Sequence, residues 1–133
     1  MNEYKRLKEK LFSLFSNKIK CRLDNISATC DLLNNPHRDF KSIHLAGTNG
    51  KGSVATKIAK ALSLSGYKTA LYISPHISAY EERVSIDGEL ISKKDVKILL
   101  KKIFKLQKKI NVYLSFFEIT TILAFLYFSK KKV

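Results

Sequence analysis

Glycine, lysine and hydroxyl side chains lie close together between Gly47 and Ser53, in the order Gly-Thr-Asn-Gly-Lys-Gly-Ser. Glycine lets backbone amides approach an anion closely because it has no Cβ. A helix that starts after such a turn directs its free N–H groups and the positive end of its dipole at the same place. Lys51 adds a full positive charge and Ser53 adds a hydroxyl. These residue types in this order predict a loop that binds phosphates.

The loop departs from the common phosphate-loop pattern G-x-x-x-x-G-K-[ST]. Leu45 stands where the first glycine of that pattern would be, and Gly52 replaces the hydroxyl residue that follows the lysine. That hydroxyl ordinarily contacts Mg²⁺. The metal ligand therefore has to come from elsewhere in the chain, or from Ser53 in a shifted geometry. A plain connection between a strand and a helix is the alternative interpretation of the turn.

The elements around this loop predict one βαβ unit. Ile43 to Ala46 is a short apolar run, and Val54 and Ile58 mark one face of a helix that Gly66 ends. Thr69 to Ile73 is typical of a second buried strand. Strand, glycine-rich turn, helix and strand in succession favour a parallel sheet. The predicted fold class is therefore α/β, an incomplete P-loop parallel sheet flanked by helices.

The rest of the chain is predicted as helices and one hairpin. Helical spacing at the start joins Tyr4, Leu7, Leu11, Leu14 and Phe15. Asp87-Gly88 is a tight-turn signal between short strands. Ser92 caps a long helix whose capping-box partner is Asp95. Residues 115–128 are apolar nearly all round, so they predict a helix buried on most sides.

The charge and the cysteines limit the possible functions. The formal net charge is +14, from 25 Lys and Arg against 11 Asp and Glu. Lysine supplies most of the excess positive charge and is spread along the whole chain. This disfavours a nucleic-acid-binding site, because arginine is the residue favoured for recognising nucleic acid. Cys21 and Cys30 have no metal-ligand spacing with histidine and are expected to be reduced thiols. The lysine face predicted at residues 97–108 is interpreted as a solvated surface rather than an anionic-ligand face.

The chain is expected to be cytoplasmic and to have no membrane segment. Its charged beginning, Met1 to Lys10, is not followed by the apolar stretch of a signal peptide. The longest apolar run, Ile119 to Phe128, is about half of the ~20 residues that span a bilayer.

The loop sequence resembles that of the Mur-ligase superfamily, and in particular its folate branch, folylpolyglutamate synthase and dihydrofolate synthase. Three further motifs agree in order. Ser74-Pro-His76 and Glu82-Arg-Val84 look like the family's serine-proline-histidine turn and glutamate-arginine strand. Ser115-Phe-Phe-Glu118 looks like its threonine-phenylalanine-phenylalanine-glutamate segment. The resemblance runs from about Leu23 to Phe128.

The resemblance implies roles for individual residues. Lys51 would act catalytically on the phosphates of ATP, and Ser74 would bind Mg²⁺ in place of the missing loop hydroxyl. The residues implied to hold ATP are Thr48, Asn49, Gly50, Lys51, Gly52 and Ser53. The residues implied to line the pteroate site are Ser115, Phe116, Phe117 and Glu118. His76 and Arg83 lie where a substrate carboxylate or phosphate could be met, with no role assigned. The family's glycine-leucine-acidic stretch has no counterpart at Cys21 to Asp24, which lacks the glycine.

The reaction implied is ATP-dependent addition of L-glutamate to dihydropteroate or folate through an acyl phosphate. The family is usually monomeric. By this resemblance the chain is the N-terminal part of the ATP-binding domain, with a helical lead-in over residues 1–40, the P-loop βαβ unit over 41–75, and a hairpin and helices over 76–133. The rest of that domain and the C-terminal domain would be absent, so we expect the piece to be inactive alone. Two alternatives stay open: another Mur-type ligase acting on a peptidoglycan precursor, and a basic module that binds nucleic acid or anionic lipid.

Overall fold

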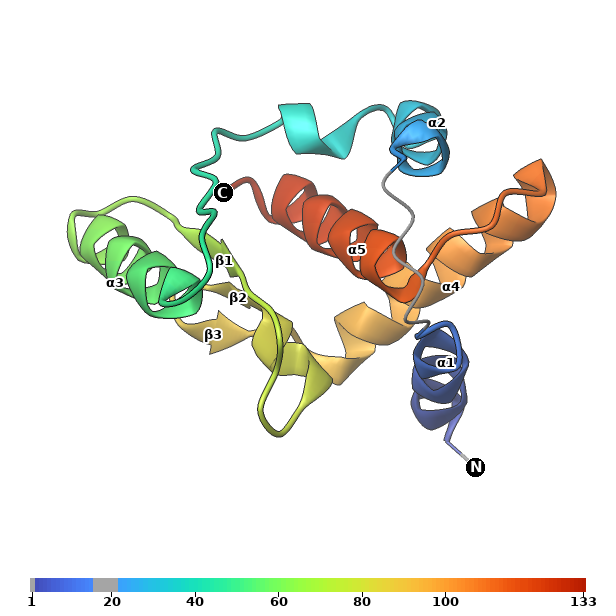
Figure 1. The fold of residues 1–133 in the computed structure, drawn as a ribbon, viewed down its shortest axis with the longest axis horizontal. Coiled ribbons are helices and arrows are strands. Elements are labelled where there is room, and N and C mark those ends of the chain that lie inside the picture. Colours follow the sequence, from blue (N-terminus) through green and yellow to red (C-terminus); the bar gives the residue numbers. More distant parts are fainter. Residues whose placement is uncertain (1, 16–21) are drawn as a thin grey trace.

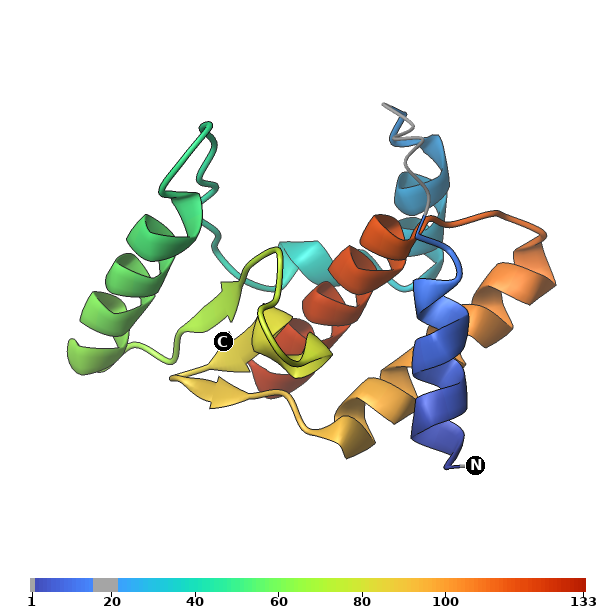
Figure 2. The same ribbon diagram turned by 60° about the horizontal axis from the view of Figure 1, so that its bottom comes forward.

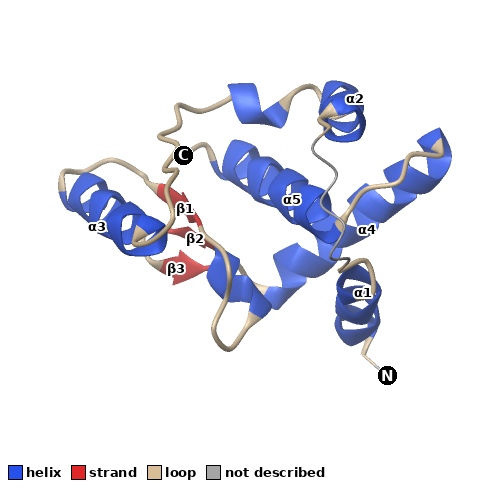
Figure 3. Ribbon diagram, viewed as in Figure 1, coloured by secondary structure: helices blue, strands red, loops and turns tan. Residues whose placement is uncertain are grey.

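The computed structural model describes residues 2–15 and 22–133. In it, helices surround one small sheet (Figures 1 and 3). In chain order the elements are α1 (Glu3–Phe12), α2 (Asp24–Leu32), the 3₁₀ turn η1 (Pro36–Arg38), α3 (Lys51–Leu64), β1 (Ala70–Tyr72), the 3₁₀ turn η2 (Tyr80–Arg83), β2 (Val84–Ile86), β3 (Glu89–Leu90), α4 (Lys93–Ile110) and α5 (Phe116–Lys131). The sheet lies between α3 on one side and the α4–α5 pair on the other (Figures 1 and 2).

The three strands form one antiparallel sheet in the order β1-β2-β3. Ala70 pairs with Ile86, and Tyr72 pairs with Val84. β2 reaches β3 through Asp87-Gly88, whose φ angles are 51° and 85°. A two-residue hairpin turn of this hand needs positive φ at both central residues. The tight turn predicted at this dipeptide is confirmed.

The parallel pairing predicted for the βαβ unit is not found among the described residues. Residues 41–46 lead into α3 without forming a strand, and Ile43 is 65% exposed. β1 instead makes its ladder with β2, the next strand along the chain. An apolar run becomes a strand only where a neighbouring backbone takes up its hydrogen bonds. Hydrophobicity at residues 43–46 does not supply that neighbour, so the prediction is corrected to a helix, α3, followed by an antiparallel sheet.

α3 ends where the sequence predicts. Gly66 has a φ of 89°, and across it the Tyr67 N–H donates to the Leu62 carbonyl at 3.1 Å. This bond takes up one of the carbonyls that a helix end leaves without an intrahelical donor, and glycine is the residue that adopts the required left-handed backbone. The chain then turns into β1, against which α3 packs.

The core lies where α1, α4 and α5 meet. α5 buries side chains around most of its circumference, as its uniformly apolar sequence predicts. The fully buried members of this core include Leu11, Leu100, Ile103, Ile119, Ile122 and Leu123. β1 joins the same core through Tyr72, whose hydroxyl lies 3.1 Å from the Thr121 hydroxyl on α5. The sheet is therefore anchored to α5, which fixes the position of the loop that follows β1.

α4 begins at the predicted cap, and its lysine face points outward as predicted. The Ser92 hydroxyl accepts a hydrogen bond from the Asp95 N–H at 3.0 Å, which caps the first turn. On the outer face, Lys97 and Lys101 form ion pairs with Glu3 at 3.8 and 2.6 Å. The side chains in both ion pairs are partly exposed, so these pairs contribute little to the free energy of unfolding. Among the described residues, no helix combines the length and apolar character needed to cross a bilayer.

Candidate functional site

The glycine-rich loop presents an uncapped helix N-terminus to solvent. Gly50 is the N-cap of α3, with φ 76° and ψ −2°, and no side chain caps the first turn. The first N–H groups of a helix have no intrahelical acceptor and lie at the positive end of the helix dipole. These groups are consequently available to an anion. Of the remaining predicted nucleotide residues, Thr48 and Asn49 are exposed on the loop, and Gly52 and Ser53 are exposed in the first turn of α3.

Lys51 is folded back over this loop. Its Nζ donates to the backbone carbonyl of Gly47, and it lies 3.3 Å from the carbonyl of Thr48. An ammonium group held above the loop by carbonyl oxygens is exposed and can exchange these neutral acceptors for phosphate oxygens, to which charge-assisted bonds are stronger. Lys51 is itself the first residue of α3, so the ammonium group and the uncapped amides belong to the same end of the helix, an arrangement that suits a phosphate group.

Ser74 lies on the exposed turn that follows β1. The Glu82 carboxylate holds this turn by accepting bonds from three successive backbone N–H groups. The bonds come from Ile77 at 2.7 Å, Ser78 at 3.1 Å and Ala79 at 2.7 Å. The bond from Ile77, and then that from Ala79, lowers the pKa of the Glu82 carboxyl below its usual value. Glu82 is thus the residue that shapes the turn, a role its family motif alone does not reveal.

Ser74 and the phosphate loop are connected through packed elements. Ser74 follows β1, and the phosphate loop precedes α3, which packs on β1. In the part of the chain that the structure describes, no hydrogen bond joins the two loops. Over the same residues, no group of three or more His, Cys, Asp or Glu side chains could hold a metal ion. The Mg²⁺ contact implied for Ser74 stays a prediction.

His76 and Arg83 form a pair that sequence reasoning left unassigned. The Arg83 Nε–H donates to His76 Nδ1 at 2.7 Å, and the guanidinium carbon lies 5.1 Å from the centre of the Phe116 ring. Arg83 is only 5% exposed. Burial, and then the charge of Arg83, lowers the pKa of His76 from its usual value. The pair joins the turn of Ser74 to the start of α5.

Ser115 and Glu118 bond to each other as a capping box at the start of α5. The Ser115 N–H and hydroxyl both donate to the Glu118 carboxylate at 2.8 Å, and the Glu118 N–H donates to the Ser115 hydroxyl at 3.3 Å. The sequence signal was present, since serine followed three residues later by glutamate before an apolar run is the signature of this cap. The structure thus gives these residues a local role, and their contact with pteroate stays a prediction.

The two adjacent phenylalanines differ in exposure. Phe116 is 5% exposed and packs edge-on against Phe12 and Tyr80, with ring centres 5.3 and 6.3 Å apart. Phe117 is 57% exposed, and its ring centre lies 6.4 Å from that of Tyr72. Of the two rings implied to line the pteroate site, only Phe117 is accessible in this structure. Phe116 belongs to the core.

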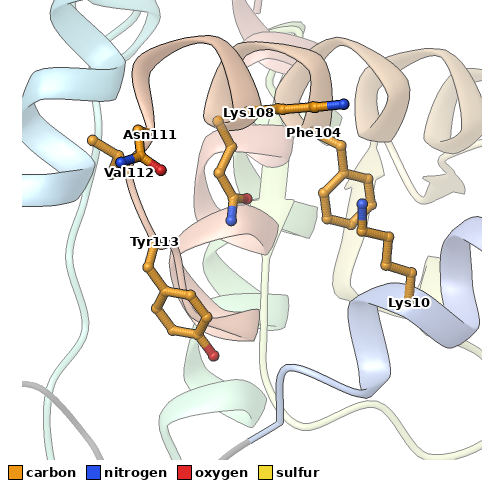
Figure 4. Close-up of a pocket in the computed structure, with 7 residues that line it drawn as sticks. Lys10, Phe104, Lys108, Asn111, Val112 and Tyr113 are labelled. Atoms are coloured by element: carbon orange, nitrogen blue, oxygen red, sulfur yellow. The ribbon is translucent and has the colours of Figure 1, made fainter.

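Two hollows lie outside the phosphate loop. One, of about 300 Å³, contains none of the predicted site residues (Figure 4). It is lined by Lys10, Phe104, Gln107, Lys108, Asn111, Val112 and Tyr113. The other, of about 290 Å³, includes His76. It is lined by Lys8, Glu9, Phe12, His76, Ser78 and Tyr80. The second hollow therefore adjoins the turn that carries Ser74.

Comparison with known proteins identifies relatives of one kind. The folylpolyglutamate synthase of Lacticaseibacillus casei is 38% identical over 108 residues, which cover 76% of this chain and 25% of that protein. The crystal structure of folylpolyglutamate synthase from Thermotoga maritima matches 99% of this chain and 32% of its own, with a TM-score of 0.87 and 38% identity. A folylpolyglutamate synthase complex with AMPPCP and folate matches with a TM-score of 0.86 and 33% identity, over 33% of its chain. No family model matches.

These likenesses confirm the α/β fold class, as a small sheet flanked by helices, and they extend over nearly all of this chain. The chain spans about a quarter of the length of the L. casei relative and about a third of the matched structures. The family predicted from the four motifs is confirmed. The chain belongs to the folylpolyglutamate synthase/dihydrofolate synthase family of ligases.

Proposed function

We propose that this chain supplies the phosphate-binding part of an ATP-dependent ligase that adds L-glutamate to dihydropteroate or a folate. The observation that supports it is the open N-terminus of α3 with Lys51 folded over Gly47 and Thr48. A related protein of known structure holds AMPPCP and folate. By this proposal Thr48 to Ser53 surround the phosphates, and Phe117 faces the flat rings of the pteroate.

The proposed reaction has two steps. A carboxylate oxygen of the pteroate or of its glutamyl tail attacks the γ-phosphorus of ATP, and ADP leaves, which yields an acyl phosphate. The amine of glutamate then attacks the acyl carbon, loses a proton and releases phosphate. In the first step Lys51 and the α3 amides neutralise charge on the transferred group and hold it in line. Mg²⁺, when bound, would add charge neutralisation, and the Ser74 hydroxyl is the ligand that the described residues offer.

We also propose that these 133 residues do not catalyse ligation alone. Residues 2–15 and 22–133 contain no group of three or more His, Cys, Asp or Glu side chains that could hold a metal ion. A phosphoryl-transfer site needs carboxylate or comparable ligands that fix the metal as well as the nucleotide. We expect nucleotide binding without turnover.

The first test is nucleotide binding by the Lys51→Ala variant. Removing a cation that contacts phosphate costs about 1.5–3 kcal/mol for a charge-assisted bond, so we expect AMPPCP to bind at least about tenfold more weakly, measured by calorimetry. Lys57→Ala is the matched control, since Lys57 is exposed on the same helix beyond the loop. Equal AMPPCP affinity in the two variants would contradict the proposal. Salt-sensitive polynucleotide binding that survives Lys51→Ala would favour the basic-module alternative instead.

A further inference from the structure

Arg83 is a buried cation that no carboxylate neutralises within the described residues. It is 5% exposed and takes part in none of the ion pairs there. The two neighbouring glutamates are occupied elsewhere: Glu81 accepts from the Tyr4 hydroxyl, and Glu82 accepts from the backbone of the turn. A buried charge is costly unless it is paired or hydrogen-bonded. The contacts that replace an ion pair here are the Phe116 ring and His76.

The hydrogen bond between Arg83 and His76 determines which ring nitrogen of His76 carries the proton. The Arg83 Nε always bears hydrogen, so at 2.7 Å it can only donate, and His76 Nδ1 has to accept with a lone pair. A ring whose Nδ1 accepts holds its hydrogen on Nε2. Edge-on contacts with Phe12 and Tyr80, at 5.8 and 6.4 Å between ring centres, keep the imidazole in one orientation.

The ring borders the hollow of about 290 Å³ beside the Ser74 turn. In residues 2–15 and 22–133, no protein atom accepts from His76 Nε2. Lys8 and Ser78 add an ammonium and a hydroxyl to the same lining, and Glu9 adds one carboxylate. Most of these polar groups are donors. An oxygen that bears negative charge is the ligand atom that suits them, whether it belongs to a carboxylate or a phosphoryl group.

We infer that Arg83 is a positioning residue that fixes the His76 proton on Nε2, and that Nε2–H donates to an anionic oxygen of a substrate in the adjoining hollow. The inference rests on the proposed function, because it assigns a second contact to a substrate of that same ligase. By this inference the substrates meet two different contacts. The phosphate loop binds the nucleotide phosphates, and His76, beside the Ser74 turn, donates a hydrogen bond to an anionic oxygen.

The tautomer is tested without any ligand. Nitrogen-15 NMR of the 133-residue protein should show His76 with a protonated Nε2 and an unprotonated Nδ1. In Arg83→Met, which keeps an apolar stem and removes the donor, the two nitrogens should exchange the proton and their shifts should converge. A His76 spectrum that is the same in wild type and Arg83→Met would overturn the positioning role.

The donor role is tested by calorimetry with two probes, AMPPCP for phosphoryl oxygens and folate for carboxylates. We expect His76→Ala to weaken one or both by about tenfold, and His76→Gln to restore most of the loss because its amide N–H replaces Nε2–H. Loss for AMPPCP alone assigns the oxygen to phosphate, and loss for folate alone assigns it to carboxylate. His37→Ala is the control, since the His37 ring packs against Phe125 on α5.

The possible failures can be told apart. If both probes bind wild type and His76→Ala equally, the donor role is overturned while the ligase proposal stands. If His76→Gln fails to restore binding that His76→Ala has lost, the hydrogen bond is not what His76 supplies, and the donor role is again overturned. If wild type binds neither probe, the proposed function fails and takes the donor role with it, whereas the tautomer spectrum still decides the positioning role.

Discussion

Gly50 and Gly52 lie two positions apart, one at the end of the phosphate loop and one at the start of α3, and glycine serves a different purpose at each. Gly50 has φ 76° in the left-handed region, where an L side chain is strained. Gly52 lies in the first turn of α3, and a Cβ there would meet no atom within 4 Å. Backbone strain therefore explains Gly50, and it does not explain Gly52. A close approach of phosphate to the α3 amides is what would exclude a side chain from Gly52.

This contrast predicts opposite stability changes for two alanine variants. Gly50→Ala should lower the free energy of unfolding by about 1–2 kcal/mol, because alanine must adopt the left-handed backbone. Gly52→Ala should leave it unchanged or raise it by up to about 1 kcal/mol, because alanine favours the helix. Urea titration measures both. A destabilised Gly52→Ala would show that the loop is constrained by contacts other than those described.

Single residues also show where sequence reasoning was limited. Phe116 and Phe117 are adjacent members of one motif, and both were predicted to line the substrate site. α5 is apolar on nearly every side, so periodicity could not distinguish the buried ring from the exposed one. Phe116 is buried because Phe12 and Tyr80, distant in sequence, pack against it. Exposure at this motif depends on tertiary contacts, which composition and spacing do not contain.

At the scale of elements, helices were predictable where caps and periodicity agree. α1 buries Tyr4, Leu7 and Leu11 as their spacing predicts, and Ser92 caps α4. Residues 43–46 show the limit, because a strand needs a partner that the local sequence does not specify. The resemblance of the motifs to a ligase family predicts roles for the loop residues, but it does not indicate that β1 pairs antiparallel with β2.

The capping box of α5 gives a prediction at this scale. Ser115→Ala removes the acceptor for the Glu118 N–H and the hydroxyl that donates to its carboxylate, so the free energy of unfolding should fall by about 1 kcal/mol. Ser115→Thr keeps the hydroxyl and is the matched control, with little expected change. Thermal unfolding followed by circular dichroism measures both variants. If Ser115→Ala were as stable as Ser115→Thr, the hydroxyl would not be needed for the cap, and a role toward substrate would become the better explanation of this position.

At the scale of the molecule, one aromatic cluster joins segments that are far apart in the chain. Phe12 from α1, His76 from the Ser74 turn, Tyr80 from η2 and Phe116 from α5 contact one another edge-on. Edge-to-face pairs of this kind add stability beyond the area they bury. The cluster connects the core to the turn that carries the proposed metal ligand, so a change in its packing should be felt at the site as well as in the fold.

The hydroxyl of Tyr80 makes this cluster sensitive to alkaline pH. Tyr80 is 1% exposed, and its O–H donates to the Thr120 hydroxyl at 3.3 Å. Burial raises the pKa of Tyr80 well above the value of about 10 that an unfolded tyrosine has. The folded state therefore keeps the proton after the unfolded state has released it. The stability that depends on the neutral phenol is fully present below pH 10 and is lost as pH rises from there toward the native pKa.

Urea unfolding of wild type and Tyr80→Phe between pH 8 and pH 12 measures this effect. Phenylalanine keeps the ring contacts and cannot ionise, so the variant should lose stability less steeply than wild type above about pH 10. Below that pH the difference should be constant and should reflect only the missing bond to Thr120. Parallel stability curves for the two proteins across the whole range would show that the phenol titrates alike in the folded and unfolded states, and hence that this cluster is open to water in solution.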